Sequence, residues 1–259
     1  VTAPNTQQGS AGWKYNYDPV NSLSGVAPKQ WANARDTKGN LWVWIPRYSY
    51  RAIQYADDPE IKIRFSDGIN DNLAAIDGRA CKKHSAFKFG NTELTGIWVA
   101  KYAASKGAGD IPEFKPDVGA WRSITVNDIF NKCLNLKSQI TTDPSTVDSH
   151  MLKNIEWGAA AMLAKAIGKQ RPDRNSNSNY RTGYGLSALD TTGASSTTGN
   201  MTGIFDMVGN TYEYVASYVN NGNSNLNSYC KSLADADEKY KDVFPKGASD
   251  DRPSNYAAA

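Results

Sequence analysis

The spacing of the apolar residues changes near residue 125 of this 259-residue chain. Before that point, apolar side chains alternate with a period of two, for instance over residues 41–45 and 61–65, which is typical of β-strands. After it, apolar residues recur every three or four positions, which is typical of helices that bury one face. Strands followed by helices favour an α+β domain, and we expect two helices packed against small mixed sheets.

Three segments are predicted to be strands with different burial. Residues 41–45 are apolar on both faces, because two tryptophans alternate with aliphatic residues, so we expect a central strand that ends at Pro46. Residues 61–65 alternate apolar and basic side chains, which predicts a half-exposed strand. Residues 96–102 form another apolar run, and we expect that strand to be buried.

Two later segments carry helical stripes. The stripe of the first, which runs to about residue 137, comprises Val126, Ile129, Phe130, Cys133 and Leu134. We expect Cys133 to act there as a small core residue. For the second helix, Asn154 is the predicted N-cap, Glu156 lies in the first turn and Gly168 ends the helix. Its predicted buried face comprises Ile155, Ala159, Met162, Leu163 and Ala166.

Polar segments divide the chain. Residues 1–40 are rich in Asn, Ser, Pro and Gly with single aromatic residues, so we expect an extended N-terminal arm before a domain over residues 41–259. Residues 169–203 contain almost no aliphatic side chains, and so long a loop is typical of a functional or disordered segment. A second polar loop is expected over residues 220–227.

These two loops are the candidate ligand-binding surface. They are dense in Tyr, Ser, Asn and Gly, a composition in which rigid rings supply contact area and short polar groups adapt their hydrogen bonds. The candidate contact residues are Tyr180, Arg181, Tyr184, Asn221 and Asn223. A plain solvated loop is an equally good interpretation of the same composition.

The composition excludes several classes of function. Charged residues make up 21% of the chain and sum to a net charge of +3, too little to drive binding to nucleic acid or to a membrane surface. No stretch approaches the roughly 18 consecutive apolar residues of a membrane helix, so we expect no direct membrane insertion. Cys81, Cys133 and Cys230 show no metal-ligand spacing and allow at most one disulfide, whose pairing the sequence leaves open.

The run of residues 203–215, GIFDMVGNTYEYV, resembles the signature G-[LV]-[YF]-[DN]-M-x-G-N-[VA]-W-E-W of the formylglycine-generating, or sulfatase-modifying, family. Residues 96–102, 123–134 and 154–161 are similar to three further motifs of this family, in the family's order. Residues 41–51 resemble a subgroup found among phage-tail and cell-surface proteins of Firmicutes. The resemblance implies a C-type-lectin-like fold, which also serves in the variable proteins of diversity-generating retroelements.

The resemblance also implies which chemistry to look for. Active members of the family oxidise a substrate cysteine at a pair of copper-binding thiolates late in the domain. Cys230 is the only cysteine after the run 203–215, so we predict no copper site and no catalysis in this chain. The family's final R-G-G and G-F-R-V segments are absent, so we expect the domain to continue beyond Ala259. The alternative is an oxidase whose paired cysteines lie in that continuation.

In the resembling family the signature folds around Ca²⁺, a cation that prefers hard oxygen ligands. The corresponding ligands here are the side chains of Asp206 and Glu213 and the carbonyl groups of Gly209 and Thr211. In the alternative interpretation, Asp206 and Glu213 cap or salt-bridge the turn. Tyr212 and Tyr214 would then replace the family's tryptophans in the core.

We therefore expect a non-catalytic domain that binds a glycan or protein receptor through its long loops, since fold alone does not supply an activity. The expected location is extracellular, on a cell surface, a pilus-like assembly or a virion. A structural subunit of a filament or shell, whose loops make lattice contacts, is the second alternative. The chain could then form a homo-oligomer or a larger assembly.

Overall fold

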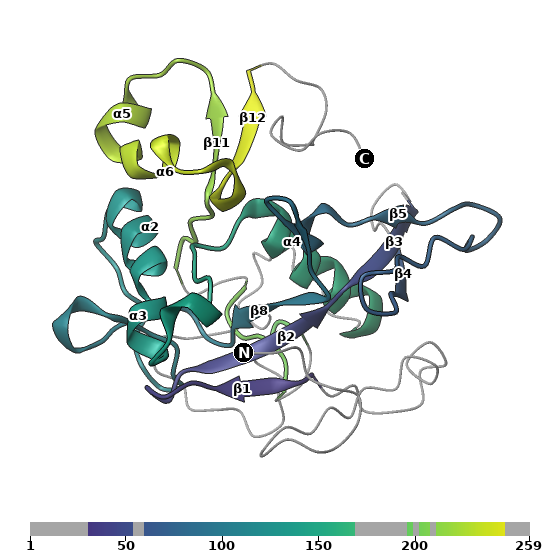
Figure 1. Cartoon of the computed structure of the whole chain (residues 1–259), viewed down its shortest axis with the longest axis horizontal. Helices are drawn as coiled ribbons and strands as arrows, with labels where there is room; N and C mark the ends of the chain where they lie inside the picture. Colours follow the sequence, from purple (N-terminus) through teal and green to yellow (C-terminus); the bar gives the residue numbers. More distant parts are fainter. Residues whose placement is uncertain (1–30, 54–59, 169–195, 199–201, 208–210, 247–259) are drawn as a thin grey trace.

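The computed structural model describes residues 31–53, 60–168, 196–198, 202–207 and 211–246. Over these ranges the chain is a mixed α+β structure with small sheets and few helices, as the change of apolar spacing predicts (Figure 1). None of the helices in these ranges is long and apolar enough to span a membrane.

A three-stranded antiparallel sheet lies at the centre of the described structure. Its order is β1 (Asn33–Arg35), β2 (Leu41–Pro46) and β8 (Gly96–Ala100), so the predicted central position of β2 is confirmed. Trp44 and Trp98 are cross-strand partners on β2 and β8, with ring centroids 5.1 Å apart. Strand β1 lies in the expected N-terminal arm, so the end of that arm forms an edge of the sheet.

A second antiparallel sheet has the order β4 (Glu60–Phe65), β3 (Tyr48–Ile53) and β5 (Lys82–Lys83). Strand β4 confirms the strand predicted from its alternating apolar and basic residues. Arg51 on β3 lies directly opposite Lys62 on β4. Because like charges at directly opposite positions destabilise a sheet, this face requires neutralisation from outside the sheet.

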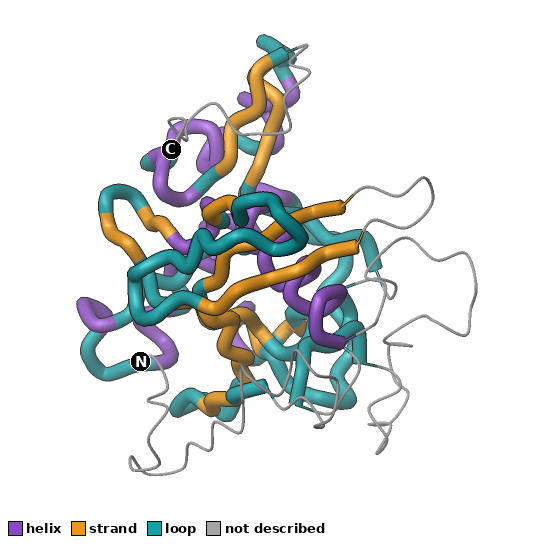
Figure 2. The backbone as a smooth tube through the Cα atoms, turned by 90° about the vertical axis from the view of Figure 1, so that its right-hand side faces the viewer, coloured by secondary structure: helices purple, strands orange, loops and turns teal. Residues whose placement is uncertain are grey.

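The connection between β4 and β5, residues 66–81, supplies that neutralisation; we call it the β4–β5 loop. Asp77 pairs with Lys62 at 2.8 Å and with Arg51 at 3.3 Å. Arg64 Nε donates a hydrogen bond to the carbonyl of Ala74 at 2.9 Å. These contacts fix a loop that projects on the right in Figure 1, the side that faces the viewer in Figure 2.

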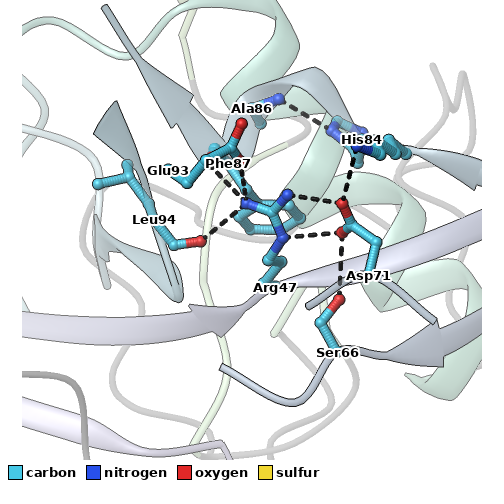
Figure 3. A network of polar contacts seen from close by, with 9 residues as sticks. Arg47, Ser66, Asp71, His84, Ala86, Phe87, Glu93 and Leu94 are labelled. Atoms are coloured by element: carbon cyan, nitrogen blue, oxygen red, sulfur yellow. Dashed lines mark hydrogen bonds and ion pairs between the residues drawn. The ribbon is translucent and has the colours of Figure 1, made fainter. Parts of the chain in front are cut away.

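A buried ion pair anchors the start of this loop (Figure 3). Arg47 donates from Nε and Nη2 to the two carboxylate oxygens of Asp71, at 2.8 and 2.7 Å. Its Nη1 also donates to the carbonyls of Phe87 and Leu94, at 3.0 and 3.1 Å. Burial by itself raises the pKa of Asp71, but the contact with Arg47 outweighs it and holds that pKa below its usual value.

Helix α4 (Asn154–Leu163) packs against β2, β4 and the short turn before β6, and continues as the π-helical turn η4 (Ala164–Gly168). The predicted N-cap at Asn154 is wrong by one residue. The carboxylate of Glu156 accepts a hydrogen bond from the backbone N–H of Lys153 at 2.9 Å, which makes Lys153 the N-cap. The predicted apolar face of α4 is confirmed, because all five of its residues belong to the main core or pack against it.

Helix α2 (Val126–Asn135) buries its predicted stripe in a second, smaller core, with Phe130 fully buried. Cys133 packs against this core, as predicted. The partners of α2 are α6 (Lys231–Asp235) and β11 (Ser217–Asn220) rather than the central sheet. This second core lies with the parallel pair β11–β12 in the upper part of Figure 1.

Short elements connect these parts. The paired strands are β6 (Lys88–Phe89) with β7 (Thr92–Glu93), β9 (Ser105–Lys106) with β10 (Pro112–Glu113), and β11 with β12 (Asp242–Pro245). The short helices are η1 (Ser85–Phe87), η2 (Ala108–Asp110), α3 (Lys137–Ile140), η3 (Pro144–Thr146), α5 (Asn225–Tyr229) and η6 (Glu238–Tyr240). Because α5 begins at Asn225, the polar loop expected over residues 220–227 is shorter than predicted.

Candidate functional site

Side-chain hydroxyl groups hold the start of the segment 203–215. The backbone N–H of Ile204 donates to Thr198 Oγ1 at 2.8 Å, and that of Met207 donates to Thr197 Oγ1 at 3.1 Å. A residue larger than glycine at position 203 would displace Thr198, because a Cβ atom there would lie 1.5 Å from Thr198 Oγ1. These contacts satisfy backbone groups in a stretch that has little regular secondary structure.

Asp206 occupies an unusual position within this stretch. Its backbone has φ +62°, in the left-handed region that Asp and Asn tolerate better than most residues. Its Oδ1 atom is buried and has no hydrogen-bond partner among the residues that the structure describes. Burial raises the pKa of the carboxyl group to about 7. A buried carboxylate oxygen without a partner is costly, which makes Asp206 a candidate ligand for something the protein binds.

Glu213 lies on the other side of the same segment. Trp157 Nε1, on helix α4, donates a hydrogen bond to Glu213 Oε2 at 3.3 Å. Partial burial raises the pKa of Glu213, although the side chain keeps solvent contact. The hydrogen bond from Trp157 lowers this pKa, and the charge of Asp206 raises it further. Both carboxylates belong to the run 203–215, and the charge of Asp206 acts on Glu213.

The structure contradicts one part of the alternative interpretation, the placement of Tyr212 and Tyr214 in the core, whereas a capping role of Asp206 and Glu213 stays a prediction. Neither Asp206 nor Glu213 forms an ion pair with any residue that the structure describes. Tyr212 is 97% exposed and Tyr214 is 57% exposed, so neither replaces a core tryptophan. Large exposed rings at such a density are a mark of binding surfaces.

An aromatic cleft adjoins the segment. The cleft is large and open. The aromatic side chains and Glu213 that line its part next to the segment come from β2, β8, the turn after β8, α4 and the segment itself: Trp44, Trp98, Tyr102, Trp157, Phe205, Tyr212, Glu213 and Tyr214. Tyr102 and Phe205 are stacked with ring centroids 5.1 Å apart. Burial, together with the charges of Asp117 and Asp206, raises the pKa of Tyr102 to about 12, so its hydroxyl group stays protonated at neutral pH.

Metal ligands in this region are few. Over the described ranges, no group of three or more His, Cys, Asp or Glu side chains is close enough to hold a metal ion. Asp206 and Glu213 therefore offer two carboxylates, and further ligands have to be carbonyl or hydroxyl oxygens or water. Of the two predicted carbonyl ligands, Thr211 is described and half-buried, whereas Gly209 lies outside the described residues.

Of the five predicted ligand-binding residues, the structure describes only Asn221 and Asn223. Tyr180, Arg181 and Tyr184 lie outside the described residues. Asn221 and Asn223 follow β11, which leads to the outer end of the molecule (Figure 1). Asn221 Oδ1 accepts from the backbone N–H of Asn223 at 3.0 Å, and Asn223 Oδ1 accepts from that of Asn225 at 2.9 Å. Both side chains are thus engaged in shaping their own turn.

All three cysteines are free thiols. Cys81 is buried, whereas Cys133 and Cys230 are half-buried. Burial raises the pKa of the Cys133 thiol to about 12 and raises that of Cys230 as well. Both thiols are consequently protonated at neutral pH, and a thiol in that form is a poor nucleophile and a poor metal ligand.

Sequence reasoning missed the residues that hold the site. Trp157 was part of the motif 154–161, but no spacing rule links it to Glu213, 56 residues later. Thr197 and Thr198 were part of a segment predicted only as a loop. No protein-family model matches the chain, and no curated protein gives a significant match. What the described residues offer is two carboxylates of one segment that form no ion pair with a described Lys or Arg, a hydroxyl-supported turn, and a cleft beside two exposed tyrosines.

Proposed function

We propose that this chain is a non-catalytic binding domain, displayed extracellularly on a cell surface, a pilus-like assembly or a virion. It recognises a glycan or a protein receptor. The observation that carries the proposal is the exposure of Tyr212 and Tyr214, which flank Glu213 at the aromatic cleft. Rings supply most of the contact energy in recognition surfaces, and adjacent polar groups fix the orientation of the ligand. Tyr180, Arg181 and Tyr184, which lie outside the described residues, stay the predicted further contact residues.

The proposed fold is the C-type-lectin-like variant that the run 203–215 suggests. Three features support it: small sheets, two main helices in the expected order, and a long polar segment between α4 and the carboxylate site. In such a fold the helices and sheets form a scaffold, and loops of variable length carry recognition.

Binding is tested with the purified chain on a glycan array and on intact cells, with tyrosine variants as probes. We expect Tyr212→Ala and Tyr214→Ala to lower the signal about tenfold or more, as loss of a central aromatic contact does. Tyr229→Ala is the matched control, because Tyr229 is 60% exposed on α5, outside the segment 203–215. Binding that survives both site variants, or that Tyr229→Ala lowers equally, would contradict this assignment.

We also propose that Ca²⁺ binds at Asp206 and Glu213. The unpartnered Oδ1 of Asp206 and the second carboxylate supply hard, anionic oxygens, which fit this ion. Because Ca²⁺ takes about six to eight oxygen ligands, the carbonyls of Gly209 and Thr211 and several waters would complete its shell. The ion would neutralise the negative charges of Asp206 and Glu213 and link these two residues of the segment.

The Ca²⁺ proposal has a direct test in thermal unfolding. We expect EDTA to lower the melting temperature and an excess of Ca²⁺ to restore it, because a ligand that binds only the folded state stabilises it. Asp206→Asn and Glu213→Gln should abolish the response to Ca²⁺. A melting curve that neither EDTA nor Ca²⁺ changes would rule out a structural Ca²⁺ at these residues.

A second candidate function, the subunit of a filament or shell, is favoured by a different observation. The projecting β4–β5 loop exposes Ile69 and Leu73, at 52% and 41% of their surfaces. Apolar side chains on a well-anchored loop suit a contact between copies of the chain. Size-exclusion chromatography decides, because a lattice subunit elutes as a large species that Ile69→Ser with Leu73→Ser reduces in size. Elution as a monomer at high concentration would exclude this function.

A further inference from the structure

Helix α4 connects the carboxylate site to the main core. Trp157, on α4, packs against that core while its Nε1 donates to Glu213 Oε2 at 3.3 Å. The helix itself is firmly held. The hydroxyl of Tyr48 donates to the carbonyl of Ala159 at 2.6 Å, and the N–H of Ile155 donates to Asp242 Oδ2 at 2.9 Å. The indole N–H is therefore presented from a rigid support.

The segment after Glu213 is tied to the same part of the fold. The backbone N–H of Ala216 donates to the carbonyl of Leu152 at 2.8 Å, just before α4 begins. Glu213 thus lies between a backbone anchor at Ala216 and a side-chain anchor at Trp157. Asp206, in contrast, depends on the end of β8, because Phe205 N–H donates to the carbonyl of Lys101 at 2.8 Å. The two carboxylates are held by separate parts of the scaffold.

We propose that Trp157 is the positioning residue of the cation site, in that its indole N–H orients the Glu213 carboxylate for the ion. This inference rests on the proposed Ca²⁺ site. One hydrogen bond occupies one lone pair of Oε2 and leaves Oε1 entirely available, since an ionised carboxylate has about four acceptor positions. The glutamate side chain is then already ordered before the ion binds, so ion binding does not have to offset the entropy of ordering it.

The same contact predicts that Ca²⁺ binding changes the environment of Trp157 on α4. An ion that draws on the charge of Glu213 changes the electrostatic environment of the indole, so the tryptophan emission of the chain should report binding. The hydrogen bond from Trp157 also links the segment 203–215 to α4, so Ca²⁺ that binds the segment should stabilise both parts against unfolding.

The test compares the Ca²⁺ dissociation constant, measured by isothermal titration calorimetry, of the unsubstituted chain, Trp157→Phe and Trp157→His. We expect Trp157→Phe to weaken binding about 10- to 100-fold, the usual effect of removing a group that orients a metal ligand, and Trp157→His to recover part of it by restoring an N–H donor. Trp42→Phe is the matched control, because Trp42 Nε1 donates to Asp36 Oδ2 at 3.1 Å on the central sheet. Its dissociation constant should equal that of the unsubstituted chain.

The outcomes separate this role from the site itself. If the unsubstituted chain binds Ca²⁺ and Trp157→Phe binds it equally well, the positioning role of Trp157 is wrong and the site stands. If the unsubstituted chain does not bind Ca²⁺, the cation site is wrong, and this role of Trp157 with it. Should Trp157→Phe fail to fold, benzothienylalanine at position 157 keeps the shape of the ring, lacks the N–H group and must show the same loss of affinity.

Discussion

Gly203 and Thr198 are neighbours only because position 203 has no side chain: a Cβ atom there would lie 1.5 Å from Thr198 Oγ1 and 2.7 Å from its Cβ. Gly203→Ala must therefore displace the hydroxyl group that accepts from Ile204 N–H. We expect a loss of about 1–3 kcal/mol in the free energy of unfolding, as overpacking usually gives. Urea denaturation measures it, and Ca²⁺ affinity should fall in parallel because the turn that carries Asp206 shifts.

Gly158 gives the opposite prediction for the same substitution. It lies within α4, and a Cβ atom there would meet nothing within 4 Å. Because glycine is a poor helix former, we expect Gly158→Ala to raise the free energy of unfolding by about 0.5–1 kcal/mol. Urea denaturation of both variants provides the comparison. Equal stabilities for the two alanine variants would contradict the packing described at Gly203.

The raised pKa of Asp206 predicts a dependence of stability on pH in the absence of divalent cations. Burial sets this pKa to about 7 in the folded chain, against 3.8 for an unperturbed aspartate. The folded state therefore holds the proton more tightly than the unfolded state, and stability falls as the pH rises from about 4 to about 7. Asp206→Asn, which tolerates the same φ of +62°, should lack this contribution.

Denaturation of both proteins in EDTA at about pH 5 and about pH 8 measures the contribution. The expected result is that Asp206→Asn gains stability relative to the unsubstituted chain at the higher pH. In saturating Ca²⁺ the difference should reverse at that pH, because the ion stabilises the ionised carboxylate. Two pH profiles that run parallel in EDTA would show that the Asp206 carboxyl group is better solvated than its buried Oδ1 indicates.

The elements that the sequence predicted are those whose pattern is local. Strand β2 and the apolar stripes of α2 and α4 follow from neighbouring residues, and the structure has all three. The partner of α2 could not be predicted, because an apolar stripe specifies burial but not the surface that covers it. Here the cover comes from α6 and β11, about a hundred residues later in the chain.

The sequence singles out Asp206 and Glu213 as candidate metal ligands, and that assignment stays a prediction. Asp206 and Glu213 stand in one short run, so the run itself indicates them. Their electrostatic state could not be predicted, since the burial of Asp206 Oδ1, and the lack of an ion pair with any described Lys or Arg, depend on tertiary structure. The same holds for Trp157, whose contact with Glu213 joins elements that no local pattern relates.

Arg47 and Asp71 form a pair whose removal should release the β4–β5 loop. Their side chains are 4% and 6% exposed, so Arg47→Met leaves a buried carboxylate without its main partner. We expect a loss of about 3–5 kcal/mol, together with faster hydrogen exchange over residues 66–81. The control is Lys231→Ala, which breaks the exposed pair with Asp235 and should change stability by no more than about 0.5 kcal/mol. Unchanged exchange in the loop would show that Arg47 does not anchor it.

Glu156 predicts the behaviour of the fold in acid. Burial opposes its ionisation, but contact with His150, at 3.1 Å, and then with Lys153, at 3.3 Å, outweighs burial and lowers the pKa to about 2. A carboxyl group whose pKa is lower in the folded state stabilises the fold above its unfolded pKa, and that stability is lost as the pH falls. The window runs from 4.5, the unperturbed value, down to about 2.

Glu156→Gln should therefore cost about 3–5 kcal/mol at neutral pH, because Lys153 is fully buried and loses an anionic partner. The variant should also lose less stability between about pH 4.5 and about pH 2 than the unsubstituted chain does. Glu60→Gln is the control, since Glu60 is 46% exposed beside Lys62 and its loss should change stability by about 1 kcal/mol or less. If both variants unfold at the same acid pH as the unsubstituted chain, the acid sensitivity of the fold does not arise at the start of α4. The only role left for the Glu156 carboxylate would then be its capping contact with the N–H of Lys153.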